Sequence, residues 1–558
     1  MGWRDPYARR LPLRWMHPGH VQVSCSPLPA ASPTQRRLPT ANGAPARGRH
    51  FIVVWALVLF AGCAFLYTRH NAWPYWYHWD EGGKARQIAT GELNFHHPLL
   101  LLNAVRVRLL GVDTATADLQ DLTVAGRTVS ALLAAAAVAL LAVAAYRCSG
   151  RFAAVLAGLL TALSPSLFVA AHAFKEDAAL ALGFAAFFCA SAGYGEIRSR
   201  SRALLLGAAC GLAVSAKYIG VLTVPVGLVL CLTNLGRREA GLLPPRGRAL
   251  HGLLLVGAAA VFAALVNVQA LESPAAVRQE VAREVDQQRH DATGLSLGRE
   301  LVEGVEPGAA LAALLYLLAP LARRRPGPAY YAHLLLPGLY VSLLAVSLRL
   351  APRYLLPVAL FSLFLGALGI AGLRRSASLG NGGLRPGPRT LLAPVLLGAA
   401  LCTLVPRFVG TFRSFAGPDP RAELVGYIQT ALPGRAIVAC DVAVHLRDRF
   451  DWSRTQLAGR WRDRVVQPER WQKAEGDRAL DWLAAAGVTH VAINASYARH
   501  FVRWGSREGR GQFAGQGWRP PFYAALEEQG RIVWRSEEGR VTWVAPELRL
   551  YEIRPAGP

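Results

Sequence analysis

Long apolar runs separated by short polar segments dominate the chain between residues 51 and 407. The hydrocarbon core of a bilayer is about 30 Å thick, and roughly 20 apolar residues in a helix span it. The runs that approach this length are 51–68, 127–146, 152–172, 178–194, 251–270, 308–322, 329–349, 355–373 and 390–407. They predict membrane-spanning helices.

A further apolar stretch, residues 203–233, is too long for one span without strong tilt, and Lys217-Tyr218 interrupts it. Because a lysine is costly in hydrocarbon, we expect two short helices that meet near the membrane surface at Lys217. The total is then eleven spans.

The distribution of arginine supports this count. With residues 1–50 in the cytoplasm, eleven spans leave five short cytoplasmic loops, and each contains arginine, as the positive-inside rule requires. These loops are 147–151, 196–202, 236–248, 323–325 and 374–389. Ten spans would put the last two on the outside.

Composition agrees with a membrane protein. Only 17% of the 558 residues are charged and 53% are hydrophobic, whereas soluble domains carry about 25% charged residues, so an ordinary soluble enzyme is excluded. The net charge of +25 lies in short tracts between apolar runs, which indicates membrane lipids rather than nucleic acid as the partner. The eight cysteines have no CxxC or CxxH spacing, and they predict neither a disulfide framework nor a zinc site.

Residues 1–50 contain no apolar run, so they predict a disordered basic cytoplasmic tail rather than a cleavable signal peptide. Residues 51–407 then form the membrane domain, and residues 408–558 lie outside. Composition rich in Ala, Arg and Gly and poor in Met suggests a bacterial chain and hence the cytoplasmic (inner) membrane.

The count places several polar clusters on the outer face. Asp80-Glu81 follows the first span; a carboxylate pair at the surface suits a general base or a cation ligand, or is a solvated loop end. Lys175-Glu176-Asp177 stands between two spans with almost no loop, facing water, a cavity or the interface.

Three more clusters share this face. Lys217 suits a phosphate as a compact point charge, or anchors a helix end. The mixed-charge segment 271–307, with His290 as a ligand, a proton shuttle or neither, predicts a helix along the interface. The Arg353 guanidinium, followed by Tyr354, fits phosphate or pyrophosphate recognition, or anchors the tenth span. Together the clusters predict an outward-facing pocket at the level of the lipid head groups.

These motifs resemble the GT-C glycosyltransferases, and most closely the group that uses dolichyl- or polyprenyl-phosphate sugars, which includes protein O-mannosyltransferases and the aminoarabinose transferases of lipid A. The residues that carry the resemblance run in the family's order: Asp80-Glu81, Gly91, His96-His97-Pro98, Lys175-Glu176-Asp177, Gly211 to Tyr218 (similar to G-L-x-x-x-x-K-Y) and Arg353 to Pro357 (similar to R-Y-x-x-P). An aromatic residue common after Asp-Glu in the family is absent, and Lys84 stands nearby.

The resemblance implies an outward-facing, inverting sugar transfer from a polyprenyl-phosphate donor to a lipid, glycan or protein acceptor. Asp80 would be the general base, Glu81 and Asp177 would position the acceptor or hold a divalent cation, and Lys217 and Arg353 would neutralise the leaving phosphate. Further substrate-binding candidates are His97, Lys175, Glu176, Tyr218, His290 and Tyr354. Candidates for a cation site are Asp80, Asp177 and His290.

Beyond about residue 418, short helix-like and strand-like segments alternate, which predicts a small α/β domain outside the membrane. Helices are expected at 422–431, 479–486 and 524–529, and strands at 436–440, 490–494 and 532–534. Segments 541–544 and 548–553 predict a closing hairpin. The expected fold is therefore an all-α polytopic membrane protein of about eleven helices, of GT-C type, with a C-terminal extracytoplasmic α/β domain.

A transporter or flippase for a lipid-linked sugar is the alternative function. It should carry ionisable residues near mid-membrane and an internal repeat, whereas the charges here gather at one face and no repeat is evident. A non-catalytic membrane scaffold would leave that gathering of acidic and basic clusters unexplained.

Overall fold

The computed structural model describes the chain in parts. They are residues 46–73, 80–234, 242–290, 301, 305–318, 328–346, 352–379, 388–433, 436–440, 465–466, 478–485, 487–495, 498–499, 519–536 and 546–553. The predicted tail before residue 46 and the expected segment 541–544 lie outside them.

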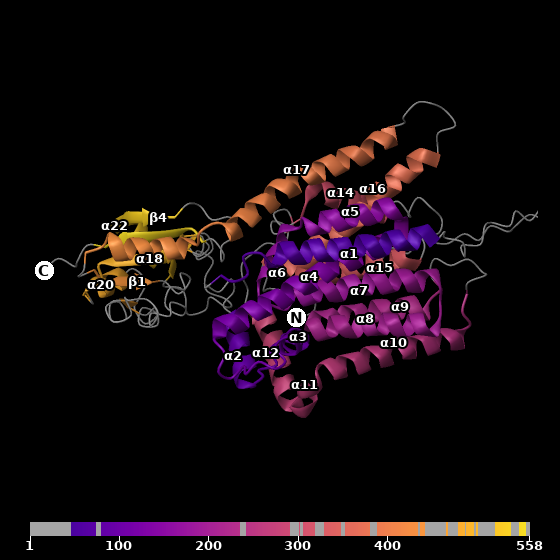
Figure 1. The fold of residues 1–558 in the computed structure, drawn as a ribbon, viewed down its shortest axis with the longest axis horizontal. Coiled ribbons are helices and arrows are strands. Elements are labelled where there is room, and N and C mark those ends of the chain that lie inside the picture. The colour runs from indigo at the N-terminus through magenta and orange to yellow at the C-terminus, as the bar shows by residue number, and fades with distance from the viewer. Residues whose placement is uncertain are drawn as a thin grey trace, which may run out of the picture. The chain divides into compact units, whose positions relative to one another are not determined.

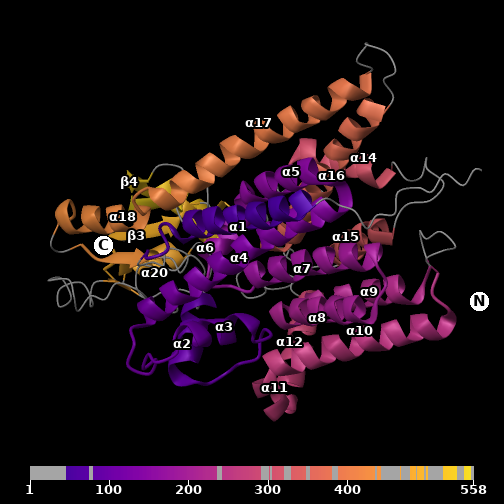
Figure 2. The same ribbon diagram turned by 45° about the vertical axis from the view of Figure 1, so that its right-hand side comes forward.

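The membrane portion is a bundle of helices that run beside one another (Figures 1 and 2). The helices at the predicted span positions are α1 (Ala46–Thr68), α4 (Leu119–Ser149), α5 (Arg151–Ala162) with α6 (Pro165–His172), α7 (Asp177–Glu196), α8 (Arg200–Ala216), α9 (Thr223–Leu232), α10 (Pro245–Val266), α14 (Pro307–Leu318), α15 (Pro328–Val346), α16 (Leu356–Leu379) and α17 (Pro388–Ala416).

Further helical elements lie between these helices along the chain. These are α2 (Asp80–Thr90), α3 (Leu100–Arg108), η2 (Tyr218–Leu222), α11 (Val268–Glu272), α12 (Pro274–His290) and η5 (Pro352–Leu355). Helix α12 is the mixed-charge helix expected in segment 271–307.

Helical segments occupy all eleven predicted positions, and the chain is a multi-span membrane protein. Among the described helices, seven are long and apolar enough to cross a membrane, and the bent pair α5–α6 makes an eighth. Tyr218–Leu232 and Pro307–Leu318 are apolar but shorter, and α8 is in neither group. Eleven crossings therefore stay a prediction.

Two breaks explain these differences. Ser164 caps α6 and Pro165 begins it, and α5 and α6 meet at 58°, because proline has no N–H to continue the preceding helix. Lys217 is extended between α8 and η2, as predicted. After it the chain folds back so closely that a Cβ on Gly220 would lie 2.0 Å from the Ala213 carbonyl oxygen.

Contacts at the helix ends agree with the predicted alternation of successive spans between the two faces of the membrane. At the end that carries the acidic motifs, Asn267 after α10 donates to Ser215 Oγ near the end of α8, at 3.1 Å. At the opposite end, Arg375 Nη2 in α16 donates to the Ser149 carbonyl at the end of α4, at 2.6 Å. Small residues let the helices pack closely: a Cβ on Gly183 would lie 2.6 Å from Ala213 Cα.

The C-terminal part is an α/β unit with a five-stranded sheet in the order β2-β1-β3-β5-β4. Its strands are β1 (Val438–Cys440), β2 (Val465–Val466), β3 (His490–Asn494), β4 (Arg531–Arg535) and β5 (Leu548–Glu552). Strands β1, β2 and β3 are parallel, and β5 pairs antiparallel with both β3 and β4. The described partners of β5 are thus β3 and β4, and the segment 541–544, expected to form a hairpin with β5, lies outside the described residues.

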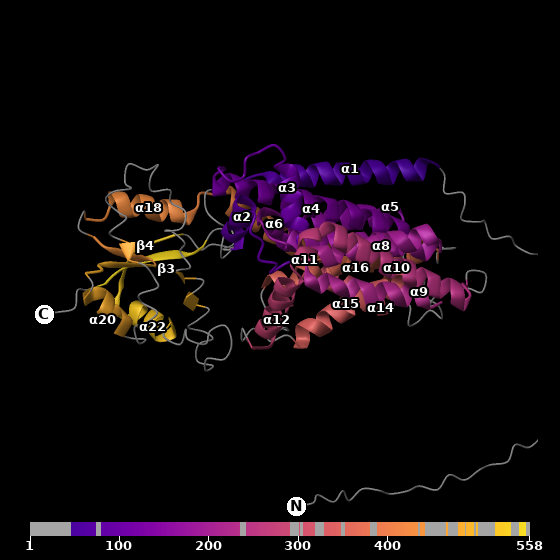
Figure 3. The same cartoon turned by 90° about the horizontal axis from the view of Figure 1, so that it is seen from below.

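Helices cover both faces of this sheet (Figure 3). Helix α18 (Pro420–Thr430) packs on the face that carries Val438, Ala492 and Leu550. Helices α20 (Arg478–Ala485) and α22 (Arg519–Gln529) pack on the other face with Ala439, Val491 and Tyr551. Neighbouring strand residues alternate between the two cores, as the period of two requires. The predicted α/β unit is confirmed.

Candidate active site

The predicted acidic and basic motifs meet at one end of the bundle, at the beginnings and ends of α2, α7, α8 and α16. Asp80 and Glu81 form the first turn of α2, and Asp177 forms the first turn of α7. Carboxylates are favourable there because the helix N-terminus carries partial positive charge. Four carboxylates and five cations gather: Asp80, Glu81, Glu176 and Asp177 with Lys84, Arg127, Lys175, Lys217 and Arg353.

Each of the four carboxylates has a cationic partner. The ion pairs are Asp80–Lys175, Glu81–Arg127, Glu176–Lys84 and Asp177–Lys217. All these side chains except Asp80 are mostly buried. The Asp80 side chain is 35% exposed, whereas those of Glu81, Glu176 and Asp177 are at most 8% exposed. Asp80 is thus the carboxylate of the four that an entering molecule can reach.

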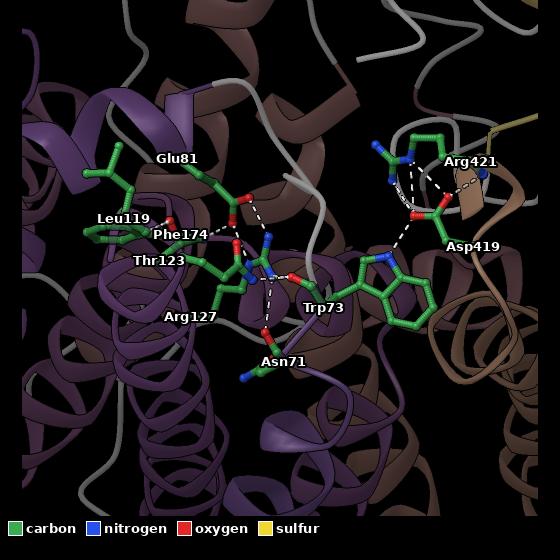
Figure 4. Close-up of polar contacts among 10 residues, drawn as sticks. Asn71, Trp73, Glu81, Leu119, Thr123, Arg127, Phe174, Asp419 and Arg421 are labelled. Carbon is green, nitrogen blue, oxygen red and sulfur yellow. Dashed lines mark hydrogen bonds and ion pairs between the residues drawn. The ribbon is translucent and has the colours of Figure 1, made fainter. Parts of the chain in front are cut away.

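The Glu81–Arg127 pair is closed off from solvent, with both side chains 0% exposed. Arg127 Nε donates to Glu81 Oε1 at 3.0 Å and Nη2 donates to Oε2 at 2.8 Å (Figure 4). The Phe174 backbone N–H also donates to Glu81, at 2.8 Å. Gly126 permits this approach, since a Cβ there would lie 2.3 Å from the Phe174 ring.

Lys175 links the pairs electrostatically. Burial and the Arg353 charge lower the pKa of Lys175 to about 8, although Asp80, Asp177 and Glu176 oppose the shift. A lysine with this pKa changes charge near neutral pH.

Glu176 lies between Lys84 and His97. Burial tends to raise the pKa of Glu176, but Lys84 and Lys175 outweigh it and hold that pKa below its ordinary value. His97 Nε2 lies 3.6 Å from Glu176 Oε2. Burial, with the charges of Lys84, Lys217 and Lys175, lowers the pKa of His97 well below its ordinary value. His97 is therefore a neutral imidazole at pH 7.

Lys217, Arg353 and Tyr354 form the other side of the cluster. Lys217 Nζ lies 2.8 Å from Asp177 Oδ1, and this partner raises the pKa of Lys217 despite burial. Lys217 Nζ and Arg353 Cζ each lie 5.2 Å from the centre of the Tyr354 ring. Two cations therefore share one aromatic ring, next to the carboxylates.

One predicted residue, Tyr218, is not part of this cluster. Tyr218 donates its hydroxyl to the Phe95 carbonyl at 2.8 Å, which ties η2 to the loop before α3. His290 ends α12, and its side chain lies outside the described residues. Helix α12 approaches the first loop through Glu280, whose Oε2 is 3.9 Å from His96 Nδ1.

The cation site expected at Asp80, Asp177 and His290 stays a prediction, because the His290 side chain lies outside the described residues. Within the described parts of the chain, no group of three His, Cys, Asp or Glu side chains is placed to hold a metal ion. Asp80 and Asp177 are instead paired with lysines, and a bound dication would have to displace those ammonium groups.

Sequence reasoning did not identify Lys84 and Arg127 as site residues. Arg127 stands at the edge of an apolar run, where it resembles an interfacial anchor. One signal could have revealed it: Thr123, Arg127 and Ser130 follow helical spacing on one face of α4, and a charged residue inside a span needs a partner. Lys84 forms a buried ion pair with Glu176.

The comparisons with known proteins extend the resemblance. The family model of dolichyl-phosphate-mannose-protein mannosyltransferases matches residues 117–246, which include Arg127, the Lys175-Glu176-Asp177 motif and Lys217. No curated protein sequence matches the chain.

Among solved structures, ArnT from Cupriavidus metallidurans bound to undecaprenyl phosphate is 17% identical, with a TM-score of 0.45 over 92% of this chain and 100% of that one. The oligosaccharyltransferase of Archaeoglobus fulgidus is 13% identical, with a TM-score of 0.46 over 81% of this chain and 72% of that one. The resemblance predicted from the motifs is confirmed by the family model: over residues 117–246 the chain has the sequence pattern of the dolichyl-phosphate-mannose-protein mannosyltransferase family.

Proposed function

We propose that this chain is a membrane glycosyltransferase that moves a sugar from a polyprenyl-phosphate donor to an acceptor, with inversion, on the outer face of a bacterial cytoplasmic membrane. The observation that carries the proposal is the contrast within the charge cluster. Asp80, partly exposed, lies beside Lys175, while Lys217 and Arg353 share the Tyr354 ring. One reachable base thus neighbours several fixed cations.

This arrangement suits a single displacement. Asp80 accepts the proton of the acceptor hydroxyl or amine while that atom attacks the anomeric carbon. The bond between this carbon and the phosphate oxygen breaks on the opposite face, and the electron pair leaves with the polyprenyl phosphate. Fixed cations stabilise charge that accumulates on a leaving group, and in the proposed mechanism Lys217, Arg353 and Lys175 supply this charge.

We assign different roles to the other acidic residues. Both Glu81 oxygens are occupied by Arg127, and Phe174 adds a third donor, which supports a role in holding α2 rather than in touching the acceptor. Asp177 orients Lys217. Glu176 pairs with Lys84 and lies 3.6 Å from His97; in the proposal this group contacts the acceptor, and the neutral His97 imidazole can donate or accept a hydrogen bond. No step is assigned to a metal ion.

The name of the matching family supports the donor class. A dolichyl-phosphate mannose is a sugar joined through one phosphate to a polyprenyl lipid, and the cations of this cluster have the charge for such a phosphate. The sequence pattern covers residues 117–246, so the sugar and the acceptor are left open in the proposal.

The test is sugar transfer from a radiolabelled polyprenyl-phosphate donor in proteoliposomes supplied with membrane extract as the acceptor source. Asp80→Asn, which keeps the size of the side chain but removes the base, is expected to abolish transfer. Asp121→Asn, an exposed carboxylate in the first turn of α4, is the matched control. Normal transfer by Asp80→Asn would exclude this residue from the chemistry, and donor that crosses the bilayer without a glycosidic product would indicate a transporter.

A further inference from the structure

Trp73 makes hydrogen bonds through its indole N–H and through its backbone carbonyl, to two segments that are far apart in the sequence. Its indole Nε1–H donates to Asp419 Oδ2 at 2.6 Å, and its backbone carbonyl accepts from Arg127 Nη1 at 2.9 Å (Figure 4). Gln120 Nε2 donates to the same carbonyl. The ring is partly buried against the core of the bundle. Trp73 therefore connects the residue that holds Glu81 to the segment that follows α17.

The Asp419 end of this connection is rigid. Asp419 Oδ1 accepts from the Arg421 backbone N–H at 2.7 Å and so caps α18. The Arg421 guanidinium binds both Asp419 oxygens, at 2.8 to 3.1 Å. Asp419 and Arg421 are 2% and 1% exposed. Because α18 packs on β4 and β5 through Leu424 and its neighbours, Asp419 belongs to the framework of the C-terminal α/β unit.

The Arg127 end leads to the reachable base. Arg127 uses Nη1 for the carbonyls of Asn71 and Trp73, at 3.0 and 2.9 Å, and uses Nε and Nη2 for Glu81. Glu81 follows Asp80 directly in the first turn of α2. A shift of the Trp73 carbonyl would turn the guanidinium, and this would move the first turn of α2 with Asp80.

We propose that Trp73 and Asp419 are positioning residues, through which the C-terminal unit holds Asp80 in its working orientation. The inference rests on the proposed function for its kinetic part, since it takes Asp80 as the base. It gives the C-terminal unit a role in the reaction that neither acceptor binding nor simple coverage of the pocket would supply.

The informative variant is Trp73→Phe, because it removes the indole N–H donor and keeps an aromatic ring and the backbone carbonyl. Trp55→Phe is the matched control: Trp55 also donates its indole N–H, to the Ala154 carbonyl at 3.3 Å, but in another part of the bundle. In donor-dependent transfer, Trp73→Phe is expected to lower kcat by about tenfold or more with little change in KM, since a small misplacement of a reacting group costs up to ~100-fold. Trp55→Phe is expected to keep the wild-type values.

Hydrogen–deuterium exchange provides a readout that does not need activity. Backbone amides of residues 69–73 and 80–90 are expected to exchange faster in Trp73→Phe than in the wild type or Trp55→Phe, with helix α10 unchanged. If the wild type transfers no sugar, the proposed function fails, and the exchange comparison still decides whether the Trp73–Asp419 contact orders α2.

Three outcomes would overturn the inference. The first is wild-type turnover and exchange in Trp73→Phe. The second is faster exchange throughout the bundle, α10 included, which would indicate general destabilisation. The third is altered exchange in Asp419→Ala but not in Trp73→Phe, which would trace the effect to the lost cap of α18 alone.

Discussion

The fully buried Glu81–Arg127 pair allows a sharp prediction on stability. Replacing Arg127 with methionine keeps a long unbranched side chain but leaves the Glu81 carboxylate in a site with 0% exposure. Removing one partner of a buried ion pair typically costs about 3–5 kcal/mol, because the remaining charge is uncompensated. The carbonyl of Asn71 also loses the hydrogen bond from Arg127 Nη1, which adds to the cost.

The entropy of unfolding scales with chain length, and for 558 residues it gives ~1 °C per kcal/mol, so Arg127→Met should lower the unfolding temperature by about 3–5 °C. The measurement is thermal unfolding of the purified protein in detergent, followed by intrinsic tryptophan fluorescence. Arg106→Met is the matched control, since Arg106 is half-buried and makes one long bond, 3.5 Å, to the Gln87 carbonyl. It should shift the unfolding temperature by no more than ~0.5 °C, in keeping with a substitution away from buried networks.

A second substitution separates the buried charge from lost packing. Glu81→Gln removes the negative charge and keeps an oxygen that can accept from the Phe174 N–H. The double variant Arg127→Met/Glu81→Gln should therefore unfold at a higher temperature than Arg127→Met alone. The reasoning is refuted if the double variant is no more stable than the single one, or if Arg127→Met behaves like Arg106→Met.

Three further predictions concern pH, donor binding and packing. Because the pKa of Lys175 is lowered to about 8, transfer should fall above pH 8 as the ammonium loses its proton, and Lys175→Arg should move this fall to higher pH. Between pH 8 and 10.5 the unfolded chain binds more protons than the folded one, so the contribution of Lys175 to folding stability should rise over that range. Unfolding measured against pH would check this. Arg353→Met should weaken the binding of undecaprenyl phosphate by roughly 10–100-fold, the loss of a charge-assisted hydrogen bond, as measured by ligand-induced thermal stabilisation; an unchanged affinity would contradict the phosphate role. Gly183→Ala should lower the free energy of unfolding by about 1–3 kcal/mol, because the added methyl group forces α7 away from α8. The control Gly257→Ala, whose Cβ would meet nothing within 4 Å, should not destabilise the protein. Equal unfolding temperatures for the two variants would contradict this account of the packing.

Much of the fold follows from local pattern alone. Apolar runs long enough to cross a bilayer, and the break at Lys217, could be predicted because burial in lipid and helix formation depend on residues close together in sequence. The same holds for the C-terminal unit, where the strand at His490–Asn494 has the predicted bounds. Even the common end of the bundle for Asp80, Asp177 and Lys217 could be predicted, since it follows from counting spans.

Only the tertiary structure determined which acidic side chain pairs with which basic one. From the sequence, Glu81 and Asp80 were both candidates for the chemistry, yet the fold buries Glu81 against Arg127 and leaves Asp80 partly exposed. Adjacent residues on a helix point in different directions, and their partners come from helices distant in the sequence, so neither spacing nor composition could assign them. The contact between Trp73 and Asp419 joins positions 346 residues apart. Such a pair depends on how whole helices pack, and local pattern carries no information about it.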